Sequence, residues 1–161
     1  MHAMVGDERA DGGFEPPRYN RILVALDDSP AAMLAFRHAV GVAREQRALL
    51  TLLTVVPTPS SRVAAAGIAP SELLAEMQAE ASARLRAVAS RAPDDVSLTT
   101  LLRQGDPAAE ILAVLSDDSF DLVCMGARGR GWLATAVLGS VSAAVLHRSP
   151  TPVMVLHPAP A

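Results

Sequence analysis

The chain of 161 residues lacks lysine altogether and contains one cysteine and very few aromatic side chains. All 14 basic residues are arginine, which excludes a Schiff-base lysine and the lysine of a Walker-type phosphate loop. Aromatic residues make up 3% of the chain, which disfavours stacking on nucleic-acid bases. The lone Cys124 excludes an internal disulfide and is typical of a reducing cytoplasm. Any cationic contact to phosphate must therefore come from arginine.

Charge and hydropathy exclude two further classes of partner. A net charge of −3 argues against a nucleic-acid binder, which usually has a basic balance or stripe. Residues 1–18 are polar, lack the apolar core of a signal peptide, and are expected to form a disordered leader. No later segment is long enough to span a bilayer. We expect a cytoplasmic protein with one domain at residues 19–158.

Short apolar runs alternate with segments of helical periodicity. Hydrophobic residues make up 50% of the chain but aromatic residues only 3%, so the core must consist of Ala, Val, Leu and Ile. We expect strands at 21–26, 49–56, 96–103, 122–125 and 153–156, and helices at 30–43, 71–91, 107–115 and 140–148. The role of the small-residue loop at 58–69 stays open. This alternation predicts an α/β fold with a parallel sheet covered by helices on both faces, and a ligand site at the carboxyl ends of the strands.

Glycines follow the apolar strand at 122–125 in the pattern Gly126-x2-Gly129-x9-Gly139-Ser140. Glycine lets backbone N–H groups approach an anion closely, and a helix start adds donors and the positive end of a dipole. The pattern therefore predicts a phosphate cradle. We expect a side chain at Gly126 or Gly129 to block the phosphate while leaving the fold intact.

Acidic and hydroxyl side chains stand at the predicted helix starts. Asp27, at the end of the first strand, suits a hydroxyl or amine of a nucleoside. Asp28 and Ser29 are predicted to cap the first helix, and Asp106 caps the helix that begins at Pro107. Ser140 is either a plain helix cap or an anion ligand, and both roles can hold together.

The remaining candidates for chemistry are few. Arg128 and Arg130 either contact phosphate or lie solvated at the surface, and Trp132 is more consistent with a core anchor than with a lid. Cys124, inside an apolar strand, is predicted to be an inert core residue. No histidine has metal-ligand spacing, no Gly-x-Ser-x-Gly elbow is present, and no general base is evident. The sequence therefore contains no clear catalytic constellation.

The glycine pattern resembles the ATP-binding signature of the universal stress protein family. Other parts of the chain, between Tyr19 and His157, are similar to further landmarks of that family: Ile22–Ser29, Leu53–Val56, Gly105-Asp106-Pro107 and Ser149–Val155. Asp28 departs from the family pattern and adds a negative charge near a polyanion, which Arg128 and Arg130 could offset.

The resemblance implies a Rossmann-like fold of the adenine nucleotide alpha hydrolase type, with five parallel strands and ATP at their carboxyl edge. It implies that the Val55 backbone holds adenine, that Asp27 contacts the adenosine portion, and that magnesium is held mainly by the phosphates. It also implies a homodimer formed through the strand at 153–156. The full set of expected nucleotide-binding residues is Asp27, Val55, Gly105, Met125, Gly126, Arg128, Gly129, Gly139, Ser140 and Val141.

Three functions remain open on this basis. The leading hypothesis is an ATP-binding regulatory module of the stress response, without rapid turnover. The alternatives are a slow ATPase and a dimeric interaction protein that binds AMP, cyclic AMP or no nucleotide.

Overall fold

The computed structural model describes residues 15–59, 69–127 and 138–158. In these ranges strands alternate with helices in the predicted order. The elements are β1 (Arg21–Ala25), α1 (Pro30–Gln46), β2 (Leu49–Val56), α3 (Pro70–Ala89), β3 (Leu98–Gln104), α4 (Pro107–Asp117), β4 (Leu122–Gly126), α5 (Ser140–Arg148) and β5 (Val153–Leu156). Most of the predicted leader, most of the loop at 58–69, and Arg128, Gly129, Arg130 and Trp132 lie outside the described residues.

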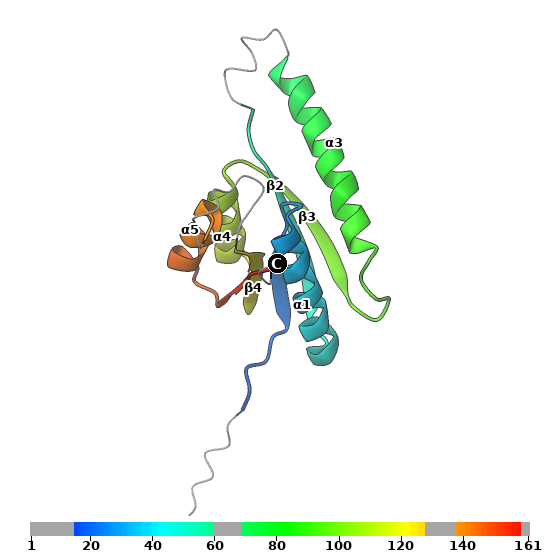
Figure 1. The fold of residues 1–161 in the computed structure, drawn as a ribbon, viewed down its shortest axis with the longest axis vertical. Coiled ribbons are helices and arrows are strands. Elements are labelled where there is room, and N and C mark those ends of the chain that lie inside the picture. The colour runs from blue at the N-terminus through cyan, green and yellow to red at the C-terminus, as the bar shows by residue number, and fades with distance from the viewer. Residues whose placement is uncertain (1–14, 60–68, 128–137, 159–161) are drawn as a thin grey trace, which may run out of the picture.

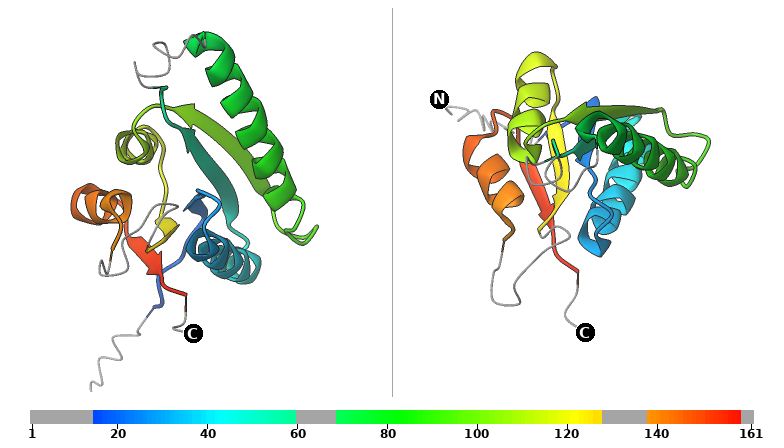
Figure 2. Two further views of the ribbon diagram at one scale, coloured as in Figure 1. Left: turned by 45° about the horizontal axis from the view of Figure 1, so that its top comes forward. Right: turned by 90° about the horizontal axis from the view of Figure 1, so that it is seen from above.

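All strands of the sheet run parallel, in the order β3-β2-β1-β4-β5. Figure 1 shows β3 beside α3, and β4 on the side of α4 and α5. The chain starts at the central β1, builds outward to β3, and then returns to the other side of β1 for β4 and β5. Helices α1 and α3 cover one face of the sheet, and α4 and α5 cover the other (Figure 2). The connections after β1 and β4 therefore leave toward opposite faces, which opens a crevice between the carboxyl ends of these two strands.

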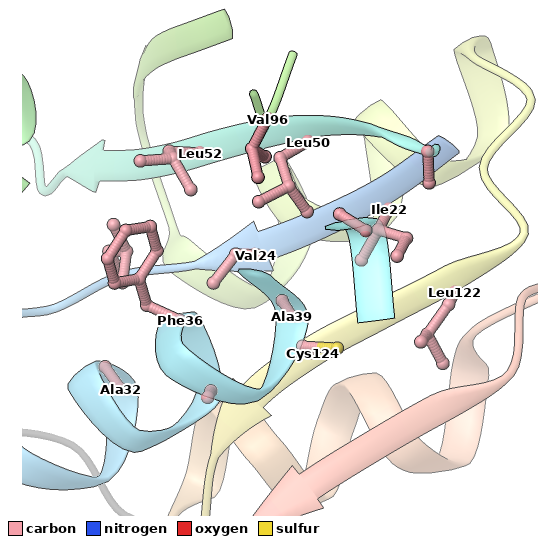
Figure 3. Close-up of a cluster of buried hydrophobic side chains, with 14 of the residues drawn as sticks. Ile22, Val24, Ala32, Phe36, Ala39, Leu50, Leu52, Val96, Leu122 and Cys124 are labelled. Atoms are coloured by element: carbon pink, nitrogen blue, oxygen red, sulfur yellow. The ribbon is translucent and has the colours of Figure 1, made fainter. Parts of the chain in front are cut away.

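Successive residues of each inner strand enter two separate apolar cores. Ile22 and Val24 of β1 pack toward α1 with Phe36 (Figure 3), whereas Leu23 packs toward α4 and α5 with Val145. Alanines line the inner side of α1, which lets this helix lie close to the sheet: Ala32, Ala35, Ala39 and Ala43. Strands buried on both faces read as continuous apolar runs, which is why they were recognisable in the sequence.

Cys124 of β4 is fully buried in the core shared with α1 (Figure 3). Burial raises the pKa of its thiol to about 12, because the thiolate would lose its hydration. The predicted core position of Cys124 is confirmed.

Two helix starts match the sequence prediction. The Ser29 hydroxyl accepts a hydrogen bond from the Ala32 N–H at 3.1 Å, and the Asp106 carboxylate accepts one from the Ala109 N–H at 2.9 Å. Both residues are N-caps followed by proline at the first helical position, Pro30 in the first case.

Two local predictions are wrong, and one of the two roles considered for Ser140 is excluded. Asp28 does not cap α1; it has a positive φ of 66° and forms an ion pair with Arg84 of α3. Ser140 is the first residue of α5, and Gly139 is the N-cap. Val96 precedes β3 in a turn in which its N–H donates to the Pro93 carbonyl, so the strand begins later than its β-forming residues suggested.

Candidate functional site

A cleft of about 300 Å³ opens where the carboxyl ends of β1, β2 and β4 meet α4 and α5. This volume is at the lower end of the range for small-molecule sites. The walls are mostly apolar: Ala25, Leu26, Asp27, Leu53, Val55, Pro107, Ile111, Met125, Gly126, Gly139, Ser140, Val141 and Ser142. The cleft thus coincides with the point where the winding of the sheet reverses.

The backbone of Val55 faces this cleft. The Leu53 carbonyl accepts from the Leu26 N–H on the β1 side, and the Val56 carbonyl accepts from the Gly105 N–H on the β3 side. Peptide groups of successive residues in a strand point to opposite sides. Val55 therefore turns its N–H and its carbonyl toward the β1 side, just beyond the end of β1, where they can pair with the edge of a planar ligand.

Asp27 is the only charged side chain among the described residues that line the cleft. It directly follows the last bond between β1 and β2, and one of its carboxylate oxygens accepts from the Ser29 N–H at 3.1 Å. This bond fixes the carboxylate at the entrance to α1. A fixed carboxylate beside apolar walls is suited to accept hydrogen bonds from hydroxyl groups of a bound molecule.

The N-terminus of α5 forms another wall of the cleft. Two hydrogen bonds tie it to the end of β4: the Gly139 N–H donates to the Ala127 carbonyl, and the Ser142 hydroxyl donates to the Gly126 carbonyl, both at 2.8 Å. No described side chain caps this helix. The N–H groups of its first turn and the positive end of its dipole are therefore suited to an anion.

Gly126 is glycine for a reason that the sequence did not reveal. A Cβ on Gly126 would lie 2.7 Å from the Cβ of Ala31 and from the backbone nitrogen of Ala32. The end of β4 thus touches the first turn of α1, so a side chain here would disturb the fold. The expectation that a substitution at Gly126 leaves the fold intact is wrong.

Most of the predicted nucleotide-binding residues lie together in the cleft: Asp27, Val55, Met125, Gly126, Gly139, Ser140 and Val141. Gly105 does not line it; this glycine follows β3, has a φ of 144° and donates its N–H to the Val56 carbonyl. The predicted contributions of Arg128 and Gly129 lie outside the described residues.

Several cleft residues were not identified from the sequence. Ile111 and Leu53 carry no polar group, so their side-chain chemistry did not mark them as cleft residues. The alternation of side chains along β1 and β2 does contain a signal, because Ala25 and Leu53 have the same orientation as Asp27 and Val55. Pro107 lines the cleft because α4 packs over the sheet, and the sequence pattern does not show this packing.

A cation also approaches this end of the sheet from α3. The Arg84 guanidinium Nε lies 2.8 Å from an oxygen of Asp28, and its Nη1 lies 3.2 Å from Glu80. Arg84 thus offsets the negative charge of Asp28, a role that sequence reasoning had offered to Arg128 and Arg130.

Two kinds of site are not found in the described ranges. No three His, Cys, Asp or Glu side chains there come close enough to hold a metal ion together. No described helix is long and apolar enough to cross a membrane.

Comparison with known proteins identifies the family of the chain. The sequence model of the universal stress protein family matches residues 18–157. Universal stress protein YxiE of Bacillus subtilis is 32% identical over 147 residues, covering 86% of this chain and 99% of that protein. The structure of universal stress protein UspA from Lactobacillus plantarum superposes with a TM-score of 0.72 at 31% identity, over 88% of this chain and all of that one. A universal stress protein solved in complex with cAMP shares the fold, with a TM-score of 0.65 at 24% identity over 88% of this chain and 98% of that one. The chain belongs to the universal stress protein family.

Proposed function

We propose that this protein binds ATP in the cleft at the carboxyl ends of β1, β2 and β4, and acts as a nucleotide-dependent regulatory module in a cytoplasmic stress response. The observation that carries this proposal is the combination, in one cleft with apolar walls, of the Val55 peptide groups, the Asp27 carboxylate and the uncapped N-terminus of α5. An adenine nucleotide has a flat base, hydroxyl groups and an anion, which these features match one by one.

In the proposed complex the three features act on different parts of the ligand. The Val55 backbone pairs with the adenine edge, and Asp27 accepts from a ribose hydroxyl. Gly139, Ser140 and Val141 present the first N–H groups of α5 to the phosphates. Magnesium is held mainly by the phosphates, since no described cluster of carboxylates or histidines is suited to a metal.

Assembly is part of the same proposal. β5 is an edge strand of the sheet, and all of its residues are only half-buried. Its free backbone groups can pair with the β5 strand of a second copy and cover both edges. We propose a homodimer formed in this way.

The first test is titration calorimetry of the nucleotide-free protein with ATP and magnesium, compared with AMP and cyclic AMP. If ATP fits the cleft as proposed, the titration should show saturable binding of ATP. Tighter binding of AMP or cyclic AMP would support the cleft as the binding site but would replace ATP as its ligand. A relative of this chain was solved in complex with cAMP. Absence of binding by all three would contradict the proposed function and favour a pure interaction protein.

A pair of variants locates the site. Asp27→Asn keeps an acceptor for the Ser29 N–H but removes the charge, and is expected to weaken ATP binding about tenfold or more. Asp106→Asn is the matched control, because Asp106 caps α4, does not line the cleft, and asparagine caps equally well. Equal affinities of the two variants would show that Asp27 is misassigned. Phosphate release measured on the same samples tests the slow-ATPase alternative.

A further inference from the structure

The outer side of α1 bears a shallow groove that the nucleotide cleft does not use. Ala35 and Ala39 mark the opposite side of the helix, which is buried against the sheet. In Figure 2, α1 lies at the outside of the molecule, and no described helix or strand covers its outer side. The groove is lined by Leu34, Arg37, His38, Gly41, Val42 and Glu45.

No contact within the described part of the chain requires glycine at position 41, in the middle of α1. A Cβ added there would meet no atom within 4 Å, in contrast to Gly126. Glycine inside a helix costs about 1 kcal/mol relative to alanine, because it loses more backbone freedom on folding. What glycine offers at an exposed helical position is a flat surface that another backbone can approach closely.

The charged residues around Gly41 are arranged so that this face of α1 is complementary to the same face of a second copy. Arg37, Gly41 and Glu45 are spaced by four residues and so lie on one side of α1. In two antiparallel α1 helices that cross at Gly41, Arg37 of each copy faces Glu45 of the other, which gives two equivalent ion pairs. Within one copy the two residues are about 12 Å apart along the helix axis and do not meet.

Neither Arg37 nor Glu45 takes part in an ion pair or a side-chain hydrogen bond within the described part of the protein. Both side chains are exposed. Leu34 and Val42 flank them and are only half-buried, so apolar surface is also open to a partner. A second copy supplies the opposite charge at each position together with the same apolar flank.

We propose that the outer face of α1 docks antiparallel against the same face of a second copy, with the two helices crossing at Gly41. This contact is separate from pairing at the β5 edge, since it lies on the outer side of a helix layer. Alone it produces a dimer; together with β5 pairing it produces a tetramer. Its disruption halves the mass of the assembly in either case.

Charge reversal tests the register. Arg37→Glu leaves two negative charges on the face and Glu45→Arg leaves two positive charges, so each variant repels itself. Each variant is expected to raise the dissociation constant about tenfold or more in sedimentation velocity. An equimolar mixture of the two is expected to associate again, because each positive face then meets a negative one. Arg86→Glu and Glu76→Arg, both on the exposed side of α3, are the matched controls and should sediment like the parent.

A steric variant provides a second, independent readout. Gly41→Gln introduces a good helix former with a long side chain, which should hold the helices apart and halve the mass while the melting temperature of dilute protein stays level or rises. The proposal is wrong if the parent is a monomer at micromolar concentration, if the charge variants sediment like the parent, or if their mixture fails to associate. It is also wrong if Gly41→Gln leaves the mass unchanged.

Discussion

Substitution of Gly126 by alanine tests the contact between β4 and the start of α1. The added Cβ would lie 2.7 Å from the Ala31 Cβ and the Ala32 nitrogen, and 2.8 Å from the Ala31 carbonyl carbon. Real Cβ atoms do not come this close, so backbone must move. Ala31 and Ala32 are buried, and the Ser29 cap holds the first turn of α1 in place, so the shift is resisted on both sides. Overpacking of this kind costs about 1–3 kcal/mol.

Thermal denaturation of nucleotide-free protein, followed by circular dichroism, measures this cost. One kcal/mol corresponds to about 2–4 °C for a domain of this size, so Gly126→Ala should lower the melting temperature by about 2–12 °C. Gly41→Ala is the matched control, because its Cβ meets nothing within 4 Å and alanine is the better helix former. In dilute protein, where self-association does not contribute, this control should melt at or above the parent temperature. A Gly126→Ala protein that melts as high as the parent would refute the reasoning.

Two further predictions concern groups already placed in the fold. Cys124, with a pKa raised to about 12 by burial, stays in the neutral thiol form through neutral pH and above, so the native protein should not react with Ellman's reagent at pH 8. Unfolding in urea should expose one reactive thiol per chain, and rapid labelling of the native protein would contradict the buried position. Ser29→Ala should lower the free energy of unfolding by about 1 kcal/mol in urea titration, because the cap on Ala32 is lost. Ser140→Ala should change it little, because Ser140 caps no helix; equal losses for the two variants would show that the caps are misassigned.

The Gly126 contact changes how the nucleotide site should be tested. A loss of ATP binding in a Gly126 variant could come from a displaced α1 as well as from a blocked phosphate. Asp27→Asn avoids this ambiguity, since its hydrogen bond to the Ser29 N–H can be retained. The choice between the two variants follows from a steric contact between β4 and α1 that no local pattern reveals.

The elements of the fold were largely predictable from the sequence. Strands such as β1 and β4 are buried on both faces and therefore appear as short continuous apolar runs, while α1 and α4 repeat their apolar residues with helical period. Alternation of the two kinds of element then dictates parallel strands joined by crossover helices. Ser29 and Asp106 were recognisable as caps because the proline that follows each of them marks the first helical position.

Local predictions failed where a distant residue decided the outcome. Asp28 and Ser29 are both good capping residues, and Asp28 instead has a left-handed backbone and pairs with Arg84 of α3. The sequence also placed Gly105 with the cleft, because all strand ends at the carboxyl edge were treated as one place. In the sheet β3 is an edge strand, separated from β1 and β4 by β2, so Gly105 does not line the cleft.

The sequence by itself determined the class of fold, the edge of the sheet that carries the cleft, and most of the residues that line it, because these depend on periodicity and on strand direction. The tertiary structure alone decided which atoms meet there. It turned the Val55 peptide groups toward the end of β1, set Gly126 against α1, and brought Arg84 to Asp28. The register between strands and the approach of helices to them are set by packing between segments far apart in the chain, and no local pattern of residues encodes those distances.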